Sequence, residues 1–295
     1  MKATVFTGSA VAIITPFRDG AVDLPAFERL IERQLRCGTD AIVVCGTTGE
    51  AATLSFDERM TLIERCVRSV DHRVPVIAGS GTNSTASSIA LSKAAQSAGV
   101  DALLTVTPYY NKASQSGLVR HFSAIADAAD IPVILYNVPS RTGVSCTVQT
   151  YQTLAEHPNI VGVKEASDDF DLIQDTLRLC PPDFTVWSGN DGSTTAIMAF
   201  GGKGVISVAA NVAPREMHEL TQLCLENRFS EAGALQLKLH PLIRALFCEV
   251  NPIPVKAAAE LLGLCSGELR LPLCGISDRH LEQLTQAMNA FGASA

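Results

Sequence analysis

Short apolar runs recur along the chain and alternate with segments of amphipathic, helix-like spacing. Most of the runs are apolar at both alternating positions, as strands of a parallel sheet covered on both faces require. We expect strands at Val11–Thr15, Ala41–Cys45, Val74–Ala78, Ala102–Thr107, Val133–Asn137, Ile160–Glu165, Thr185–Ser188 and Gly204–Val208.

The segments between these runs carry helix start and stop signals. Asp23 followed by Pro25 begins a helix that Gly38 ends, and Ser55–Glu58 has the pattern of a capping box. Strand–helix units repeated in this way predict a closed (β/α)8 TIM barrel. The competing doubly wound sheet normally shows a glycine fingerprint after its first strand, where this chain has Thr15-Pro16-Phe17.

The alternation stops after about Asn227. Residues 229–249, 254–262 and 278–288 have helical patterns with no strand between them. We therefore expect a catalytic barrel over 1–227 and a C-terminal helical appendage over 228–295, packed on the barrel or used for assembly. No Gly/Ser/Pro-rich linker separates the two.

Composition narrows the class of protein. Of 295 residues, 47% are apolar and 18% charged, and the net charge of −7 has no long runs. These values indicate a globular protein without a nucleic-acid or membrane surface. The nine cysteines form no C-x-x-C and the six histidines are scattered, which favours reduced thiols in the cytoplasm and disfavours a metal site. We expect no signal peptide and no transmembrane span.

One lysine lies near the end of a predicted buried strand. Alternation places Ile160, Gly162 and Lys164 on one face of that strand. Burying an ammonium is costly, which favours the neutral amine, a nucleophile towards carbonyl carbon. The pattern of this strand is equally consistent with a structural lysine, whose amine would reach water or pair with Glu165.

Other polar groups follow the ends of the predicted strands, where barrel enzymes carry their catalytic residues. Gly46–Gly49 is either a tight turn or a row of N–H and hydroxyl donors for a carboxylate. Tyr136 shares parity with Ile134 and can face the interior beside Lys164, as a structural phenol or a proton carrier. Arg141 is either a surface charge or a carboxylate ligand over the barrel mouth.

The positions of the other lysines single out Lys164. Lys203 precedes its strand and so belongs to the opposite end of the barrel, and its glycine-rich surroundings fit a tight helix-to-strand turn. The remaining candidates fall on predicted helices or in an open loop: Lys93, Lys112, Lys238 and Lys256. Carbonyl chemistry through an imine, as in a class I aldolase or lyase, is the economical interpretation.

These motifs resemble the dihydrodipicolinate synthase family. The resemblance rests on Gly46-Thr47-Thr48-Gly49-Glu50, Thr107-Pro108-Tyr109-Tyr110, Tyr136-Asn137-Val138-Pro139-Ser140-Arg141-Thr142-Gly143 and Gly162-Val163-Lys164-Glu165. It extends from Phe6-Thr7-Gly8 to Asn251-Pro252-Ile253-Pro254-Val255-Lys256 and Leu269-Arg270-Leu271-Pro272, nearly the whole chain. Arg141 is its more specific mark, because pyruvate-dependent relatives such as N-acetylneuraminate lyase share the lysine strand and the threonine turn.

The resemblance implies an activity and a set of roles. Lys164 would form an imine with pyruvate, and the derived enamine would attack L-aspartate 4-semialdehyde in the first committed step of diaminopimelate and lysine biosynthesis. Tyr136, Thr47 and Tyr110 would form a proton relay, with Tyr110 entering from a neighbouring subunit. The implied substrate contacts are Thr47 and Thr48 for the pyruvate carboxylate, Arg141 for the semialdehyde carboxylate, and Gly189 and Ile206 for the pyruvate pocket. The family needs no metal or organic cofactor and is usually a homotetramer built as a dimer of dimers.

One part of the family pattern is degenerate. Lysine-inhibited members carry polar or charged groups around the positions matching 51–59 and 83–87. Asn83 and Tyr109 are retained, but Phe56, Arg59 and Ser87 do not fit, since an arginine repels a cationic ligand. We expect weak or absent inhibition by lysine.

Two other functions stay open at this point. One is a pyruvate-dependent lyase of N-acetylneuraminate or of keto-deoxy sugar acids, which would differ in the second substrate. The other is a barrel that binds a small acid without catalysis.

Overall fold

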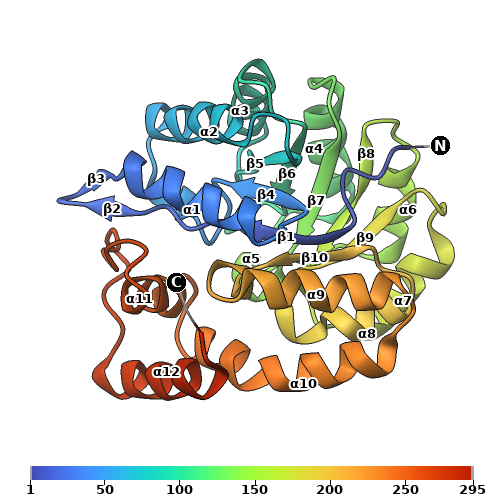
Figure 1. The fold of residues 1–295 in the computed structure, drawn as a ribbon. Helices are drawn as coiled ribbons and strands as arrows, with labels where there is room; N and C mark the ends of the chain where they lie inside the picture. Colours follow the sequence, from blue (N-terminus) through green and yellow to red (C-terminus); the bar gives the residue numbers. More distant parts are fainter. Residues whose placement is uncertain (1, 294–295) are drawn as a thin grey trace.

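The computed structural model describes residues 2–293, and its centre is a closed barrel of parallel strands (Figure 1). Neighbours around the barrel follow the order β1-β10-β9-β8-β7-β6-β5-β4. The strands are β1 (Gly8–Ala12), β4 (Ala41–Val44), β5 (Val76–Gly79), β6 (Ala102–Val106), β7 (Val133–Asn137), β8 (Ile160–Glu165), β9 (Thr185–Ser188) and β10 (Gly204–Ser207). The predicted TIM barrel is confirmed, and the open doubly wound sheet is excluded.

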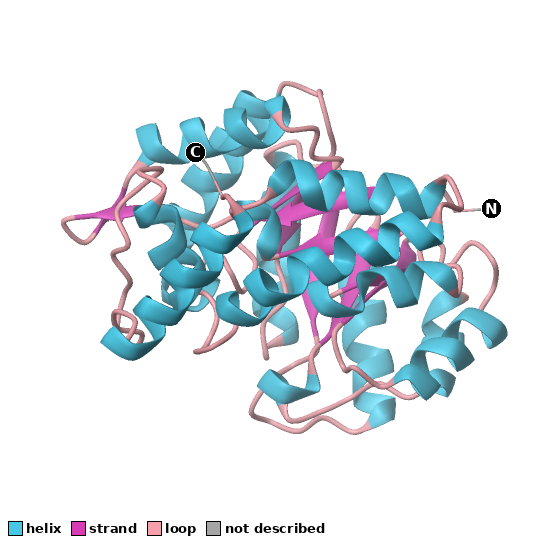
Figure 2. Cartoon of the chain, turned by 60° about the horizontal axis from the view of Figure 1, so that its bottom comes forward, coloured by secondary structure: helices cyan, strands magenta, loops and turns pink. Residues whose placement is uncertain are grey.

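Helices surround this barrel, as Figure 2 shows. They are α1 (Leu24–Arg36), α2 (Phe56–Val70), α3 (Thr85–Ser97), α4 (Gln115–Asp127), α5 (Pro139–Thr142), α6 (Val148–Ala155), α7 (Phe170–Leu179), α8 (Thr194–Ala199) and α9 (Pro214–Leu225). Asp23 caps α1 by accepting from the N–H of Ala26, and Ser55 and Glu58 form the predicted capping box of α2. The turn signals in the sequence therefore fixed most helix starts.

The first strand differs from its prediction. The sequence pattern places it at Val11–Thr15, whereas β1 spans Gly8–Ala12. The apolar run continues past the sheet, but beyond Ala12 the backbone leaves the regular ladder, and the N–H of Ile14 donates to the Asn211 side chain at 3.1 Å. A small hairpin follows that the pattern did not predict, formed by β2 (Phe17–Arg18) and β3 (Ala21–Val22).

The face assignment on β8 is also partly wrong. Lys164 pairs in register with Tyr136 of β7, but the register shifts near the start of the strand. Ile160 and Val163 both pack in the large hydrophobic cluster, whereas Val161 packs in a second cluster with Tyr136 and other side chains of the barrel strands. A β-bulge breaks simple alternation, so Ile160 does not share the face of Lys164.

Three helices form the C-terminal region: α10 (Phe229–Leu246), α11 (Ile253–Leu261) and α12 (Asp278–Phe291). α10 packs against α8 and α9, and α12 packs against α10 and α11 (Figure 1). The segment between α11 and α12 returns to the barrel, where the Arg270 guanidinium donates to the carbonyls of Thr53 and Gly20. The division at residue 227 stays a prediction. None of the described helices is long and apolar enough to cross a membrane.

Arg270 also gives the protein a testable pH dependence. Its guanidinium donates to the Glu58 carboxylate, with an Nη1–Oε2 distance of 2.8 Å, and this bond is the main reason why the pKa of Glu58 falls to about 2. Because the folded pKa is lower than the unfolded one, the stabilisation is present at neutral pH and is lost as the pH falls from about 5 towards 2.

We therefore expect the difference in unfolding free energy between wild type and Arg270→Gln to shrink by about 1 kcal/mol between roughly pH 7 and pH 3, after allowing for solvent screening of a partly exposed pair. Urea unfolding at several pH values measures it. A difference that does not change with pH would contradict this role of Glu58.

Candidate active site

Lys164 lies inside the barrel. It is the fifth residue of β8 and is 5% exposed. Its Nζ lies 4.4 Å from the centre of the Tyr136 ring, which comes from the neighbouring strand β7. The two proposed chemical groups are adjacent because they occupy paired positions of parallel strands.

Glu165, the alternative ion-pair partner, is engaged elsewhere. Its carboxylate accepts from the Tyr151 hydroxyl at 2.7 Å and from the Asn137 amide at 3.0 Å. Burial raises the pKa of Glu165, and these hydrogen bonds oppose the rise. Because alternation places Glu165 on the opposite face of β8 from Lys164, this buried network braces β7, β8 and α6 from outside the barrel.

The threonine turn, Gly46–Gly49, follows β4. The N–H of Gly49 donates to the carbonyl of Gly46 and the N–H of Glu50 to that of Thr47, both at 3.1 Å. Thr48 is buried, and its Oγ1 accepts from Nδ2 of Asn251 at 3.0 Å. Since the oxygen accepts in this bond, the hydroxyl proton of Thr48 is available for a second acceptor, such as a carboxylate.

Arg141 lies on the short helix α5, directly after β7, and its side chain is exposed. Nη2 donates to the carbonyl of Asn251 at 2.9 Å. This bond uses one of the five guanidinium N–H donors and fixes the direction of the side chain. The remaining donors can form the paired bonds that suit a carboxylate.

A cavity of about 320 Å³ lies beside several of these groups, although Lys164, Thr48, Gly189 and Ile206 are not among the residues that line it. Thr47, Tyr136 and Arg141 all lie on its wall, together with Tyr109 and Asn251. Tyr136 therefore faces the cavity and also contacts the amine of Lys164 through its ring. This volume suits a ligand of a few carbon atoms with one or two charged groups.

Gly189 directly follows β9, and Ile206 lies on β10. The N–H of Gly189 donates to the carbonyl of Glu165 at 2.7 Å, and a Cβ atom there would come within 2.6 Å of the Ala166 side chain. Glycine is thus needed for the close approach of β9 to β8. Ile206 is fully buried and packs in the same cluster as Tyr136.

Comparison with known proteins agrees with this geometry. The model of the dihydrodipicolinate synthetase family matches residues 5–291. The chain belongs to this family. It is 48% identical to the 4-hydroxy-tetrahydrodipicolinate synthase of Acetivibrio thermocellus over 99% of both chains. Similar solved structures include the dihydrodipicolinate synthase of Thermotoga maritima, with a TM-score of 0.97 and 44% identity over 98% of this chain and 99% of that one.

A second similar structure is a pyruvate complex, that of the chloride-inhibited dihydrodipicolinate synthase of Acinetobacter baumannii. It has a TM-score of 0.96 and 44% identity, and covers 98% of this chain and 99% of that one. The family membership expected from the sequence motifs is confirmed, and the chain is an enzyme of the lyase type.

Asp191 is a further buried group, and it lies shortly after the end of β9. One carboxylate oxygen accepts from the N–H groups of Val208 and Ala209 at 3.1 and 3.0 Å, which ties the end of β9 to that of β10. The other oxygen is buried without a hydrogen-bond partner within residues 2–293. Burial raises the pKa of Asp191, while Ser207, the two N–H groups and the charge of Lys164 oppose the rise.

Asn251 was missed. It was part of the family resemblance but had no assigned function, and it contacts both Thr48 and Arg141. Its position more than one hundred residues after Arg141 gives no local signal of this contact, because the contact depends on how the C-terminal region packs on the barrel mouth.

Tyr110 is not brought to the cavity of this chain. Its side chain is 89% exposed, and its backbone has a left-handed φ of 74°, which is uncommon for an aromatic residue. The predicted regulatory residues lie nearby: the Asn83 carbonyl accepts from the Asn111 amide at 2.9 Å, and Tyr109 lines the cavity. Arg59 lines the same cavity and donates to the carbonyl of Ala51. Weak or absent inhibition by lysine stays a prediction.

In the described part of the chain, no three His, Cys, Asp or Glu side chains gather as a metal site would require.

Proposed function

We propose that this chain condenses pyruvate with L-aspartate 4-semialdehyde to give 4-hydroxy-tetrahydrodipicolinate. The observation that carries the proposal is the buried amine of Lys164 against the ring of Tyr136, a residue that lines a cavity together with Thr47 and Arg141. An amine inside a barrel can attack a keto carbon, and hydroxyl and guanidinium donors around it can hold two carboxylates.

The first half-reaction builds the nucleophile. The neutral amine of Lys164 attacks the keto carbon of pyruvate, and loss of water leaves an imine. A proton then leaves the methyl group and the electron pair forms an enamine. The phenol of Tyr136, whose ring contacts the amine, is placed to move protons in these steps.

The second half-reaction closes the ring. The enamine carbon attacks the aldehyde carbon of the semialdehyde, and the aldehyde oxygen takes up a proton to become the hydroxyl. The amino group of the semialdehyde portion then attacks the imine carbon. Lys164 departs as the free amine, and the cyclic imine is released.

The two carboxylates need separate holders. The Thr48 hydroxyl, oriented by Asn251, and the N–H groups of its turn suit the pyruvate carboxylate. Arg141, oriented by the Asn251 carbonyl, suits the carboxylate of the semialdehyde. Gly189 and Ile206 would form the apolar part of the pyruvate pocket.

Assembly as a homotetramer belongs to the proposal too. Tyr110 has a left-handed backbone conformation, is largely exposed and does not line the cavity of its own chain, which supports a role in a neighbouring subunit. In that arrangement it would complete a proton relay with Tyr136 and Thr47.

A substrate assay tests the proposed activity. Purified enzyme is given pyruvate with aspartate semialdehyde and, separately, pyruvate with N-acetylmannosamine or glyceraldehyde. We expect efficient product formation with pyruvate and aspartate semialdehyde, and not with pyruvate and either of the other two aldehydes. Faster turnover with either sugar would favour a sugar acid lyase, and absence of a borohydride-trapped pyruvate adduct would favour a non-catalytic acid binder.

An arginine variant tests the second-substrate site. Arg141→Ala should lower kcat/KM for the semialdehyde about 10- to 150-fold, because a charge-assisted hydrogen bond contributes roughly 1.5–3 kcal/mol. Trapping of pyruvate on Lys164 should stay within about threefold of wild type, since that step does not need Arg141. The control is Arg120→Ala, an exposed arginine on α4. Equal losses in the two variants would contradict the assignment.

A further inference from the structure

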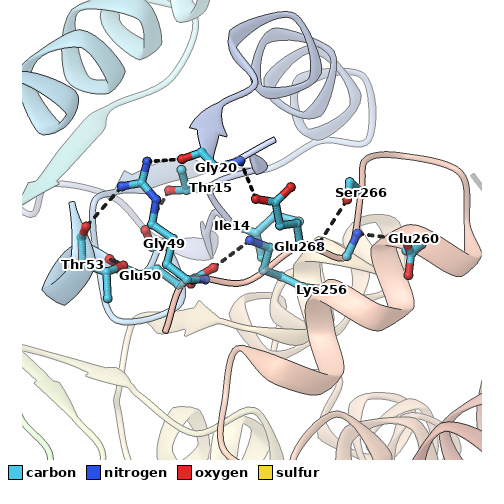
Figure 3. A network of polar contacts seen from close by, with 12 residues as sticks. Ile14, Thr15, Gly20, Gly49, Glu50, Thr53, Lys256, Glu260, Ser266 and Glu268 are labelled. Atoms are coloured by element: carbon cyan, nitrogen blue, oxygen red, sulfur yellow. Dashed lines mark hydrogen bonds and ion pairs between the residues drawn. The ribbon is translucent and has the colours of Figure 1, made fainter. Parts of the chain in front are cut away.

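The structure contains a second buried lysine, which the proposed reaction does not use. Lys256 lies on α11, and Figure 3 shows its side chain reaching from the C-terminal region to Glu50. Lys256 Nζ is 2.7 Å from Glu50 Oε1, and the two side chains are 0% and 1% exposed. Burial lowers the pKa of Lys256, and the bond to Glu50 opposes this. Since desolvating two charges costs about as much as their attraction returns, stability alone is a weak reason for such a pair.

Glu50 is fixed from several sides and directly follows the threonine turn. Its backbone is left-handed, with a φ of 53°, and its N–H closes the turn onto Thr47. Its second carboxylate oxygen accepts from the N–H of Arg270 at 3.2 Å. A non-glycine residue adopts a left-handed conformation when its surroundings impose it. Here the Lys256 amine and the Arg270 N–H both bind the Glu50 carboxylate.

The same helix reaches the turn at a second point. Asn251 lies immediately before the start of α11 and donates to Thr48 Oγ1, and four residues after Pro252 the helix presents Lys256 to Glu50. Lys256 of α11 and Asn251, two residues before this helix, thus contact the chain on both sides of Gly49, at Glu50 and at Thr48. The only other side-chain bond described for the turn comes from Thr15, which donates to the Gly49 carbonyl at 2.7 Å (Figure 3).

We propose that the Glu50–Lys256 ion pair positions the threonine turn for capture of the pyruvate carboxylate. The two residues are positioning residues, because they act through Thr47 and Thr48 and touch no reacting atom. This inference rests on the proposed function. It adds that the C-terminal helical region sets the affinity of the barrel site for its keto acid.

The test separates positioning from folding by neutralising both partners. In Glu50→Gln/Lys256→Met, the glutamine keeps an acceptor for the N–H of Arg270, and the methionine keeps an apolar stem against Phe17, over whose ring Nζ now lies at 4.2 Å. No charge is left buried and unpaired, so the variant is expected to fold. Folding is checked by circular dichroism and thermal unfolding.

The readout is the rate of borohydride-trapped pyruvate adduct against pyruvate concentration. We expect the half-saturating concentration to rise about tenfold or more, because displacing a binding group by about 1 Å costs up to a hundredfold. The trapping rate at saturating pyruvate should fall by less than about threefold, since Lys164 lies on β8 and no described hydrogen bond or ion pair joins the Glu50 and Lys256 side chains to that strand.

The control variant is Arg270→Gln, which also loosens the C-terminal region but leaves the threonine turn and the backbone bond to Glu50 in place. It should keep the half-saturating concentration within about twofold of wild type. An equal rise in both variants, or no rise in the double variant, overturns the proposal. If the double variant does not fold, Glu50→Gln alone gives the decision by the same criterion, because burial lowers the pKa of Lys256 and the amine can become neutral once its partner is gone. Absence of an adduct in wild type would instead refute the proposed function.

Discussion

Replacing Lys164 by methionine should abolish covalent capture of pyruvate and lower turnover by about four orders of magnitude or more. The amine is the proposed nucleophile, and no other lysine side chain in the described structure is close to the Tyr136 ring. Methionine matches the length of the buried stem without its charge, so the barrel is expected to keep its fold. Mass spectrometry after pyruvate and borohydride, with the modified peptide mapped, measures capture, and a coupled assay measures turnover.

Two lysines provide the comparison. Lys203→Met changes an exposed lysine just before β10, at the opposite end of the barrel, and should leave both measurements unchanged. Lys256 is at least as buried as Lys164, so burial alone does not identify the nucleophile. An adduct that maps to Lys256, or Lys164→Met turnover within about a hundredfold of wild type, would refute the imine on Lys164.

The barrel itself was predictable because each of its signals is local. The bounds of β7, β8 and β9 agree with the apolar runs, which proline, asparagine or aspartate residues delimit. The predicted end of β1 was wrong because the N–H of Ile14 donates to the side chain of Asn211, which follows the neighbouring strand β10 and is remote in sequence. The hydrophobic pattern predicts that a strand exists. The residue at which the strand ends depends on hydrogen-bond partners that are remote in sequence.

The site was predictable only where one strand end determines the position of the residue. Tyr136 and Lys164 were placed together correctly because paired positions of neighbouring strands face the same way. Asn251 and Lys256 could not be placed, because their contacts with Thr48 and Glu50 span more than two hundred residues. The C-terminal region also supplies part of the cavity wall, through Val250, Asn251 and Pro252 before α11 and through Pro272 and Leu273 between α11 and α12.

Replacing Tyr136 by phenylalanine should reduce turnover about 10²- to 10³-fold at saturating substrates, because a positioned proton-transfer group contributes roughly that factor. The ring is 7% exposed and packed within the barrel, so loss of the hydroxyl alone leaves the packing intact. The trapped pyruvate adduct should still form, but more slowly, since the amine remains and only its proton carrier is gone. Rapid-quench trapping and steady-state kinetics together separate the two effects.

The matched control is the same change on the other side of β8. Tyr151 is fully buried, and its hydroxyl donates to Glu165 at 2.7 Å. Tyr151→Phe should lower the unfolding free energy by about 1–3 kcal/mol, because a buried carboxylate loses a hydrogen-bond donor, with little change in turnover per folded molecule. If Tyr136→Phe behaves like Tyr151→Phe, the phenol of Tyr136 is structural. If Tyr136→Phe loses turnover at unchanged stability, proton transfer by that hydroxyl explains why a tyrosine lies against the amine.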